Sequence, residues 1–229
     1  MRLYIKFNIT LLSIISNFFL ISVLFFILKL DTIRVELYQQ LVRHFGKIEI
    51  VLVGDSLTRR NSDIAMLVGG FRFNAINIAI DGYTIPQIVK QSNDLLLPLS
   101  PCLVIVMAGT NRQEMDSLNS NLIQYEKMLD GLLKQSIDVI LLETLLTQRA
   151  NLNSYINQLN ENLKIITMKK NISYFSSNTY LTENGRLLDK YSEDGVHLSL
   201  LGYETINKNL LPFINQKYSS KRLECNNIL

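Results

Sequence analysis

Short apolar runs alternate with amphipathic stretches along most of this chain, and the alternation predicts a parallel sheet covered by helices. The runs that predict strands are 48–53, 73–78, 103–107, 139–142 and 172–175. Their hydrophobic residues are consecutive, which is typical of parallel strands buried on both faces. Strands that alternate with helices favour right-handed crossovers and an α/β fold with helices on both sides of the sheet.

The stretches between and after these runs have the apolar spacing of amphipathic helices. They cover residues 85–96, 118–133, 152–166 and 200–213. Pro86 is tolerated in a first turn, and Ser199 is expected to cap the last helix. Ligands of such sheets bind beyond the carboxyl ends of the strands. We therefore expect any active site to lie among the residues that follow the strands.

The first thirty residues have a different character. No charged residue occurs from Ile9 to Leu28, and about 20 helical residues suffice to cross a hydrocarbon core of about 30 Å. The run predicts a transmembrane anchor. A cleaved signal peptide is one alternative, although its apolar region would be shorter and would end in small residues. A buried core helix is the other, although its apolar residues would form one stripe.

Positive charges on the two sides of this run nearly balance, with Arg2 and Lys6 before it and Lys29 and Arg34 after it. Together with the free amino terminus they favour a cytoplasmic N-terminus and a globular part outside the cytoplasm. The expected segments are an anchor (1–30), an amphipathic connector (31–46), a globular domain (47–216) and a C-terminal tail (217–229).

Composition excludes several classes of protein. Hydrophobic residues make up 48% of the chain and charged residues 19%, which is too apolar for a disordered protein. The net charge is +3 without a basic stripe, so no nucleic-acid partner is expected. Two distant histidines and two cysteines do not form a zinc pattern, and no phosphate-binding loop is present, so we expect no metal and no cofactor. Cys102 is expected to be a small buried apolar residue, and Cys225 to be unpaired.

Polar residues with catalytic chemistry stand where the strands end. In chain order they are Ser56, Gly82, Asn111, Asp194 and His197. A serine hydroxyl needs a base to become a nucleophile. His44 precedes the first strand and would lie about 20 Å from the far end, which leaves His197 to serve Ser56. Asp194 is close enough in sequence to orient the imidazole and to stabilise the imidazolium.

These stretches resemble the four sequence blocks of the SGNH hydrolases, also called GDSL-type esterases and lipases. The blocks are Gly54-Asp55-Ser56-Leu57, Asn77-Ile78-Ala79-Ile80-Asp81-Gly82, Gly109-Thr110-Asn111 and Asp194-Gly195-Val196-His197-Leu198, and the resemblance covers about residues 47–213. It implies a flavodoxin-like SGNH fold, a three-layer α/β/α sandwich with a five-stranded parallel sheet. It also implies a Ser56–His197–Asp194 triad and an oxyanion hole formed by the Ser56 and Gly82 backbone N–H groups and the Asn111 amide.

Asp55, Arg112 and Glu143 lie near the same edge and are weaker candidates for lining the pocket. The expected function is a serine esterase that cleaves a short-chain or acetyl ester of a small molecule, lipid or glycan through an acyl-Ser56 intermediate. An acyltransferase that moves an acyl group onto or off an extracellular glycan is one alternative. A non-catalytic binding domain that keeps the fold is the other. The substrate and the oligomeric state stay open.

Overall fold

A computed structural model describes residues 17, 20, 48–61, 75–112 and 117–226 of the chain. The chain divides into two units, residues 1–46 and 47–229, and the fold below is that of the second. The predicted anchor and connector lie, except for Asn17 and Leu20, outside the described residues. Within the described part, none of the helices combines the length and the apolar character that crossing a membrane requires.

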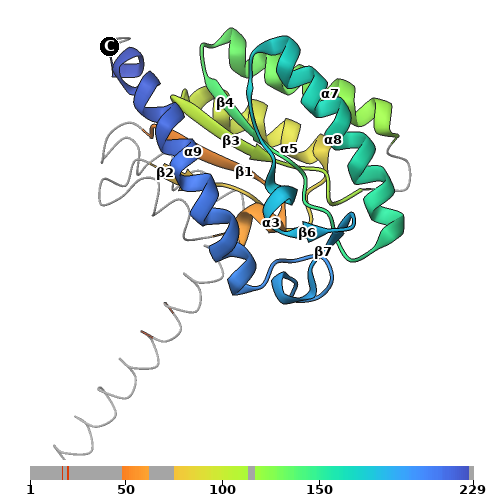
Figure 1. The fold of residues 1–229 in the computed structure, drawn as a ribbon. Helices are drawn as coiled ribbons and strands as arrows, with labels where there is room; N and C mark the ends of the chain where they lie inside the picture. Colours follow the sequence, from red (N-terminus) through yellow and green to blue (C-terminus); the bar gives the residue numbers. More distant parts are fainter. Residues whose placement is uncertain (1–16, 18–19, 21–47, 62–74, 113–116, 227–229) are drawn as a thin grey trace, which may run out of the picture. The chain divides into compact units, whose positions relative to one another are not determined.

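A five-stranded parallel sheet forms the centre of the second unit, with the strands in the order β2-β1-β3-β4-β5 (Figure 1). Its members are β1 (Ile50–Gly54), β2 (Ala75–Asn77), β3 (Leu103–Met107), β4 (Asp138–Leu142) and β5 (Ser173–Phe175). The predicted strands are confirmed. Every residue of β1 and β3 is buried, which explains their unbroken apolar runs. The chain order reverses between β1 and β3, and ligands of such sheets bind at this crevice.

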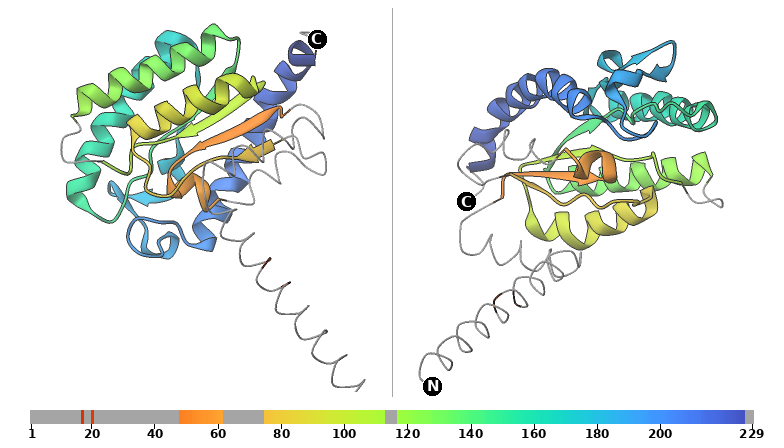
Figure 2. Two further views of the ribbon diagram at one scale, coloured as in Figure 1. Left: turned by 180° about the vertical axis from the view of Figure 1, so that it is seen from behind. Right: turned by 90° about the horizontal axis from the view of Figure 1, so that it is seen from below.

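Helices cover both faces of the sheet. They are α3 (Ser56–Arg59), α5 (Ile85–Gln91), α6 (Leu97–Leu99), α7 (Leu118–Lys134), α8 (Ala150–Lys170) and α9 (Leu200–Asn226), with a π-helical turn, η2 (Ser92–Leu96), between α5 and α6. Helices α5, α7 and α8 pack side by side, in that order, behind the sheet in Figure 1, and α9 crosses its front. Figure 2 shows the same layers from behind and from below. The predicted α/β sandwich is therefore confirmed.

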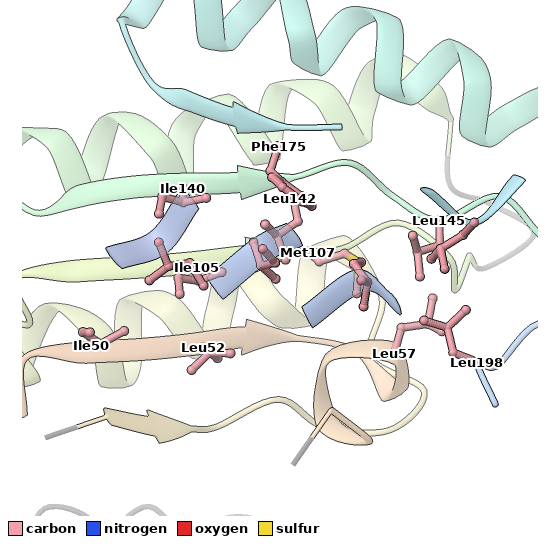
Figure 3. Close-up of a cluster of buried hydrophobic side chains, with 14 of the residues drawn as sticks. Ile50, Leu52, Leu57, Ile105, Met107, Ile140, Leu142, Leu145, Phe175 and Leu198 are labelled. Atoms are coloured by element: carbon pink, nitrogen blue, oxygen red, sulfur yellow. The ribbon is translucent and has the colours of Figure 1, made fainter. Parts of the chain in front are cut away.

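Alternate residues of the central strands point to the α9 layer and form one hydrophobic cluster with it (Figure 3). The cluster includes Ile50, Leu52, Ile105, Met107, Ile140 and Leu142 of the sheet and Ile206, Leu210 and Ile214 of α9. Fully burying a side chain of this size contributes about 1.5–3 kcal/mol relative to leaving it exposed. Apolar burial is therefore what holds the C-terminal helix on the sheet.

Three features differ from the sequence expectations. Helix α9 continues to Asn226, through residues that the sequence places in a tail. Cys102 is buried, as expected, but it is also disulfide-bonded, which the sequence did not predict; a single bond needs no framework of many cysteines. A hairpin of β6 (Thr182–Glu183) and β7 (Arg186–Leu187), flanked by 3₁₀ turns η3 (Ser177–Tyr180) and η4 (Asp189–Tyr191), was not predicted.

Candidate active site

Ser56 lies at the first residue of α3, directly after β1, and is 6% exposed. Asp55 caps this helix: its Oδ1 accepts a hydrogen bond of 3.0 Å from the Leu57 N–H. Gly54 makes the sharp turn feasible, because a Cβ there would collide with the Met107 carbonyl oxygen and the Thr58 side chain. The turn therefore holds the Ser56 hydroxyl at the carboxyl edge of the sheet.

The Ser56 hydroxyl is hydrogen-bonded to the imidazole of His197, with 2.9 Å between Oγ and Nε2. The other ring nitrogen, Nδ1, lies 2.6 Å from Asp194 Oδ2. Asp194 Oδ1 accepts the backbone N–H groups of His197 at 2.8 Å and of Val196 at 3.0 Å. These bonds, the His197 N–H foremost, lower the pKa of Asp194 far below its usual range. The result is a continuous chain from a hydroxyl through an imidazole to an ionised carboxylate.

The segment that carries Asp194 and His197 is a closed loop. Ser192 and Leu198 form an antiparallel bridge across its base. The Gly195 carbonyl accepts a hydrogen bond of 2.8 Å from the backbone N–H of Gln148, in the connection between β4 and α8. Sequence reasoning missed Gln148, because a bond made by a backbone N–H leaves no side-chain signal. The bridge at its base and the hydrogen bond from Gln148 thus both hold the loop, in addition to its connection to α9.

The segments that follow β2 and β3 meet at the same edge. The Asn111 side-chain amide donates to the carbonyl of Tyr83, directly after Gly82, over 3.3 Å. Gly82 has a φ of +76°, which L-residues rarely adopt, and nothing lies within 4 Å of the Cβ that it lacks. Glycine is therefore required there by backbone conformation rather than by space. Asn77 at the end of β2 donates from its amide to the Thr58 carbonyl over 2.8 Å, which ties this segment to α3.

The weaker pocket candidates have partners of their own. Asp55 is fully buried behind Ser56. The Arg112 guanidinium lies over the ring of Tyr155 on α8, 4.9 Å from its centroid. Glu143 accepts the backbone N–H of Asn178 at 2.9 Å, and burial raises the pKa of Glu143. The structure thus joins Ser56, His197 and Asp194 directly. The three weaker candidates make contacts elsewhere.

The arrangement suits covalent catalysis by the Ser56 hydroxyl. In the described part of the chain, no group of three or more His, Cys, Asp or Glu side chains is placed to hold a metal ion. An imidazole bonded to a serine hydroxyl can remove its proton as the oxygen attacks a carbon, and an ionised carboxylate on the far nitrogen favours that transfer. Acyl transfer is the reaction class that this geometry supports.

Comparisons with known proteins point in the same direction. The model of the GDSL-like lipase/acylhydrolase family matches residues 52–205. No curated protein sequence matches the chain significantly.

Among solved structures, a GDSL-like lipase from Bacteroides thetaiotaomicron has a TM-score of 0.67 at 19% identity, over 79% of this chain and 98% of that one. The lipase/acylhydrolase from Enterococcus faecalis has a TM-score of 0.61 at 18% identity, over 74% and 96%. A catalytic mutant of an acetylxylan esterase from Geobacillus stearothermophilus has a TM-score of 0.61 at 15% identity, over 72% and 93%. At these identities the likeness shows the fold alone.

Proposed function

Because this chain belongs to the GDSL-like lipase/acylhydrolase family and is therefore an ester-bond hydrolase, we propose that Ser56, His197 and Asp194 are its catalytic triad. The observation that carries the proposal is the chain of two contacts, 2.9 Å from Ser56 Oγ to His197 Nε2 and 2.6 Å from His197 Nδ1 to Asp194 Oδ2. Both distances are within hydrogen-bond reach, as proton transfer requires.

In the first half of the reaction, His197 Nε2 takes the hydroxyl proton while Ser56 Oγ attacks the ester carbonyl carbon. The tetrahedral intermediate then expels the alcohol, which receives that proton from His197, and an acyl-Ser56 ester is left. In the second half, His197 deprotonates a water molecule that attacks the acyl carbon, and the acid leaves as Ser56 recovers its proton. The ionised Asp194 holds the Nδ1–H tautomer and stabilises the imidazolium in both halves.

Negative charge develops on the carbonyl oxygen in both tetrahedral states. We propose that the backbone N–H groups of Ser56 and Gly82 and the side-chain amide of Asn111 donate to it. One such donor is worth about 2.7–4 kcal/mol of transition-state stabilisation. The contact between Asn111 and the Tyr83 carbonyl supports this role, because it holds the amide beside the Gly82 backbone.

We propose a short-chain acyl ester, with acetyl the first candidate, as the substrate. Support comes from the fold that the chain shares with an acetylxylan esterase. The alcohol is then a small molecule, a lipid or a glycan hydroxyl. Transfer of the acyl group to a glycan in place of water uses the same first half-reaction.

The location of the enzyme is also a proposal. We propose that residues 9–28 anchor it in a membrane, with the catalytic unit outside the cytoplasm. The uncharged length of this run supports the anchor. The disulfide at Cys102 supports the compartment, because disulfides persist in oxidising environments and are rare in the cytosol.

A series of p-nitrophenyl esters of increasing acyl length, run beside acetylated glycans with and without a free glycan acceptor, tests the function. We expect Ser56-dependent hydrolysis that is fastest with the shortest chains, and labelling of Ser56 by a fluorophosphonate. Ser56→Ala should abolish both while the variant still folds. Substantial ester hydrolysis by that variant would refute the triad, and acyl-glycan product in place of free acid would establish a transferase.

A further inference from the structure

The segment 144–148 connects β4 to α8, and its first four residues are buried although they form no regular secondary structure. Thr144 and Thr147 are fully buried, and Leu145 and Leu146 are nearly so. Connecting segments usually run over the surface, because a buried one must find partners for its backbone N–H and carbonyl groups. A buried connection beside the proposed site therefore needs a physical explanation.

Asparagine side chains supply partners for this backbone. Asn160 of α8 accepts the Thr144 N–H at 2.9 Å and donates to the Thr144 carbonyl at 2.8 Å. Asn153 of α8 makes the same pair of bonds with Thr147, both of 2.8 Å. Asn178 of η3 adds a bond of 3.0 Å to the Thr144 carbonyl. The segment is therefore fixed against both α8 and η3.

The same segment contacts both loops that carry proposed catalytic groups. At its first residue, the Thr144 hydroxyl donates to the Ala108 carbonyl over 2.7 Å, at the start of the loop that follows β3. At its last residue, the Gln148 N–H donates to the Gly195 carbonyl in the loop that carries the proposed base. Leu145, between these contacts, belongs to the hydrophobic cluster on which α9 packs (Figure 3). One short segment is thus a common support for the two loops.

The loop after β3 depends on this support, because the ladder between β3 and β4 ends before it. Val106 and Leu141 are the last pair of that ladder, and the Thr144 hydroxyl makes its contact beyond them. The following residue, Gly109, has a φ of +128°, and a Cβ there would collide with Leu159 and lie 3.2 Å from Thr144 Oγ1. The loop therefore packs against Thr144 and Leu159 as closely as a glycine allows.

We propose that Thr144 is a positioning residue, whose hydroxyl fixes the loop that carries Asn111. Because the segment 144–148 also holds the loop of His197, it fixes one loop relative to the other. The inference rests on the proposed function, in which Asn111 donates to the carbonyl oxygen that Ser56 attacks. Donor and nucleophile must then meet the same carbonyl group, and a displacement of about 1 Å lowers catalysis strongly.

Two pairs of substitutions isolate the Thr144 hydroxyl. Thr144→Val keeps the shape of the side chain and removes the donor, whereas Thr144→Ser keeps the donor and removes the methyl group. Thr144→Ala differs from Thr144→Ser by the hydroxyl alone. Thr167→Val is the matched control, because Thr167 is also fully buried and donates to a backbone carbonyl at 2.8 Å, but that carbonyl belongs to Lys164 in the same helix, α8.

The experiment measures kcat and KM for p-nitrophenyl acetate with the full chain and these variants, at a temperature at which each is folded. We expect Thr144→Val to lower kcat about tenfold with KM nearly unchanged, the signature of an interaction made in the transition state. Thr144→Ser should recover most of that loss. Thr167→Val should keep the kcat of the wild type, even where it lowers the melting temperature as much as Thr144→Val does.

Combination with Asn111→Ala gives a readout that a merely structural role would not change. Loss of one oxyanion donor lowers kcat by about 10²–10³-fold. Since Thr144 is proposed to act through Asn111, Thr144→Val should have little further effect on kcat in the Asn111→Ala background, and a double-mutant cycle measures this coupling. Equal losses of kcat in both backgrounds would reject the inference.

The remaining outcomes separate this inference from the proposed function. Wild-type kcat in Thr144→Val, or an equally low kcat in Thr144→Ser, overturns the inference alone when Ser56→Ala is inactive. Activity in Ser56→Ala overturns both. Wild-type kcat in Asn111→Ala removes that donor and the inference with it, while Ser56-dependent hydrolysis stands. If Thr144→Val does not fold, Thr144→Ala and Thr144→Ser decide, and equal kcat values in these two reject the inference.

Discussion

Leu57 and Leu198 are buried in one hydrophobic cluster, and each directly follows a residue of the hydrogen bond between Ser56 and His197 (Figure 3). The two hydrogen-bonded residues are 141 positions apart in the sequence. A single hydrogen bond contributes about 0.5–1.5 kcal/mol net, whereas burying a leucine side chain contributes about 1.5–3 kcal/mol. Apolar packing behind the site, more than the polar contact itself, therefore brings the serine and the histidine together.

Leu198→Ala should accordingly weaken both stability and catalysis. Removing a buried leucine side chain costs about 2–5 kcal/mol, and here the cavity opens beneath the loop that carries His197. Urea unfolding measures the first effect and kcat at a temperature where both proteins are folded measures the second. Leu210→Ala, in the same cluster but within α9, is the matched control. Equal loss of kcat in both variants would contradict a local role for Leu198.

The sheet and the residues of the proposed triad could be predicted from the sequence because their signals are local. Buried parallel strands need unbroken apolar runs, and β1 and β3 are apolar throughout. The positions directly after strand ends then pointed to Ser56 and Asn111. The chain has two histidines, and excluding His44 left His197 as the base for Ser56.

The supporting contacts could not be predicted in the same way. Gln148 holds the His197 loop through its backbone N–H, and Tyr83 receives the Asn111 amide through its carbonyl, so neither role depends on residue type. The β6–β7 hairpin is too short for an alternating pattern, yet its Asn184-Gly185 turn, with both φ values positive, was a usable signal that was missed. The buried surroundings of Asp55 depend on tertiary packing that no local pattern encodes.

Asp194→Ala should lower kcat by orders of magnitude, because the imidazole loses the group that holds its tautomer. It should also lower thermal stability in a pH-dependent way. Hydrogen bonds hold the pKa of Asp194 below its ordinary value of 3.8 in the folded protein. Its contribution to stability is therefore complete above that value and is lost as the pH falls towards the folded-state pKa. Melting curves of both proteins should converge in strong acid, and an equal difference at all pH values would contradict this linkage.

The buried Asp55 should affect stability with the opposite dependence on pH, and Asp55→Asn tests this. Burial raises the pKa of Asp55 from 3.8 to about 6 in the folded protein, so the folded state keeps a proton that the unfolded state has already released. The wild type thus loses stability as the pH rises through this interval, by about 3 kcal/mol at most. The asparagine variant does not titrate. Its stability relative to the wild type should be higher at about pH 8 than at about pH 4, as chemical denaturation at the two values would measure. A constant difference would mean that Asp55 is not buried as a titrating acid.

Gly82→Ala should impair catalysis through backbone geometry alone. A Cβ at this position meets no neighbouring atom, but the φ of +76° is unfavourable for alanine by about 1–2 kcal/mol. Relief of that strain would turn the backbone N–H away from the proposed oxyanion site and lower kcat. Gly131→Ala is the control: it lies inside α7, also with open space around its Cβ. That change should raise stability by about 0.5–1 kcal/mol and leave kcat unaltered. Wild-type kcat in Gly82→Ala would remove this backbone N–H from the mechanism.

The disulfide at Cys102 yields a prediction about both stability and compartment. The chain has one other cysteine, Cys225, so we predict that an intramolecular bond joins it to Cys102. Helix α9, which carries Cys225, reaches this edge of the sheet, where the Tyr218 hydroxyl donates to the Glu49 carboxylate and the Glu49 carbonyl accepts the Cys102 N–H at 2.8 Å. Closing so long a loop should stabilise the fold by up to about 4–5 kcal/mol.

Protein exported to an oxidising compartment and denatured without reductant should therefore show no free thiol by alkylation and mass spectrometry, and should run as a monomer on a non-reducing gel. Cys225→Ser should expose one thiol and lower the melting temperature by as much as treatment of the wild type with reductant does, because both leave the same loop open in the unfolded chain. Two free thiols in the exported wild type, or a disulfide-linked dimer, would refute the intramolecular bond. Either result would also remove the support that this bond gives to a catalytic unit outside the cytoplasm.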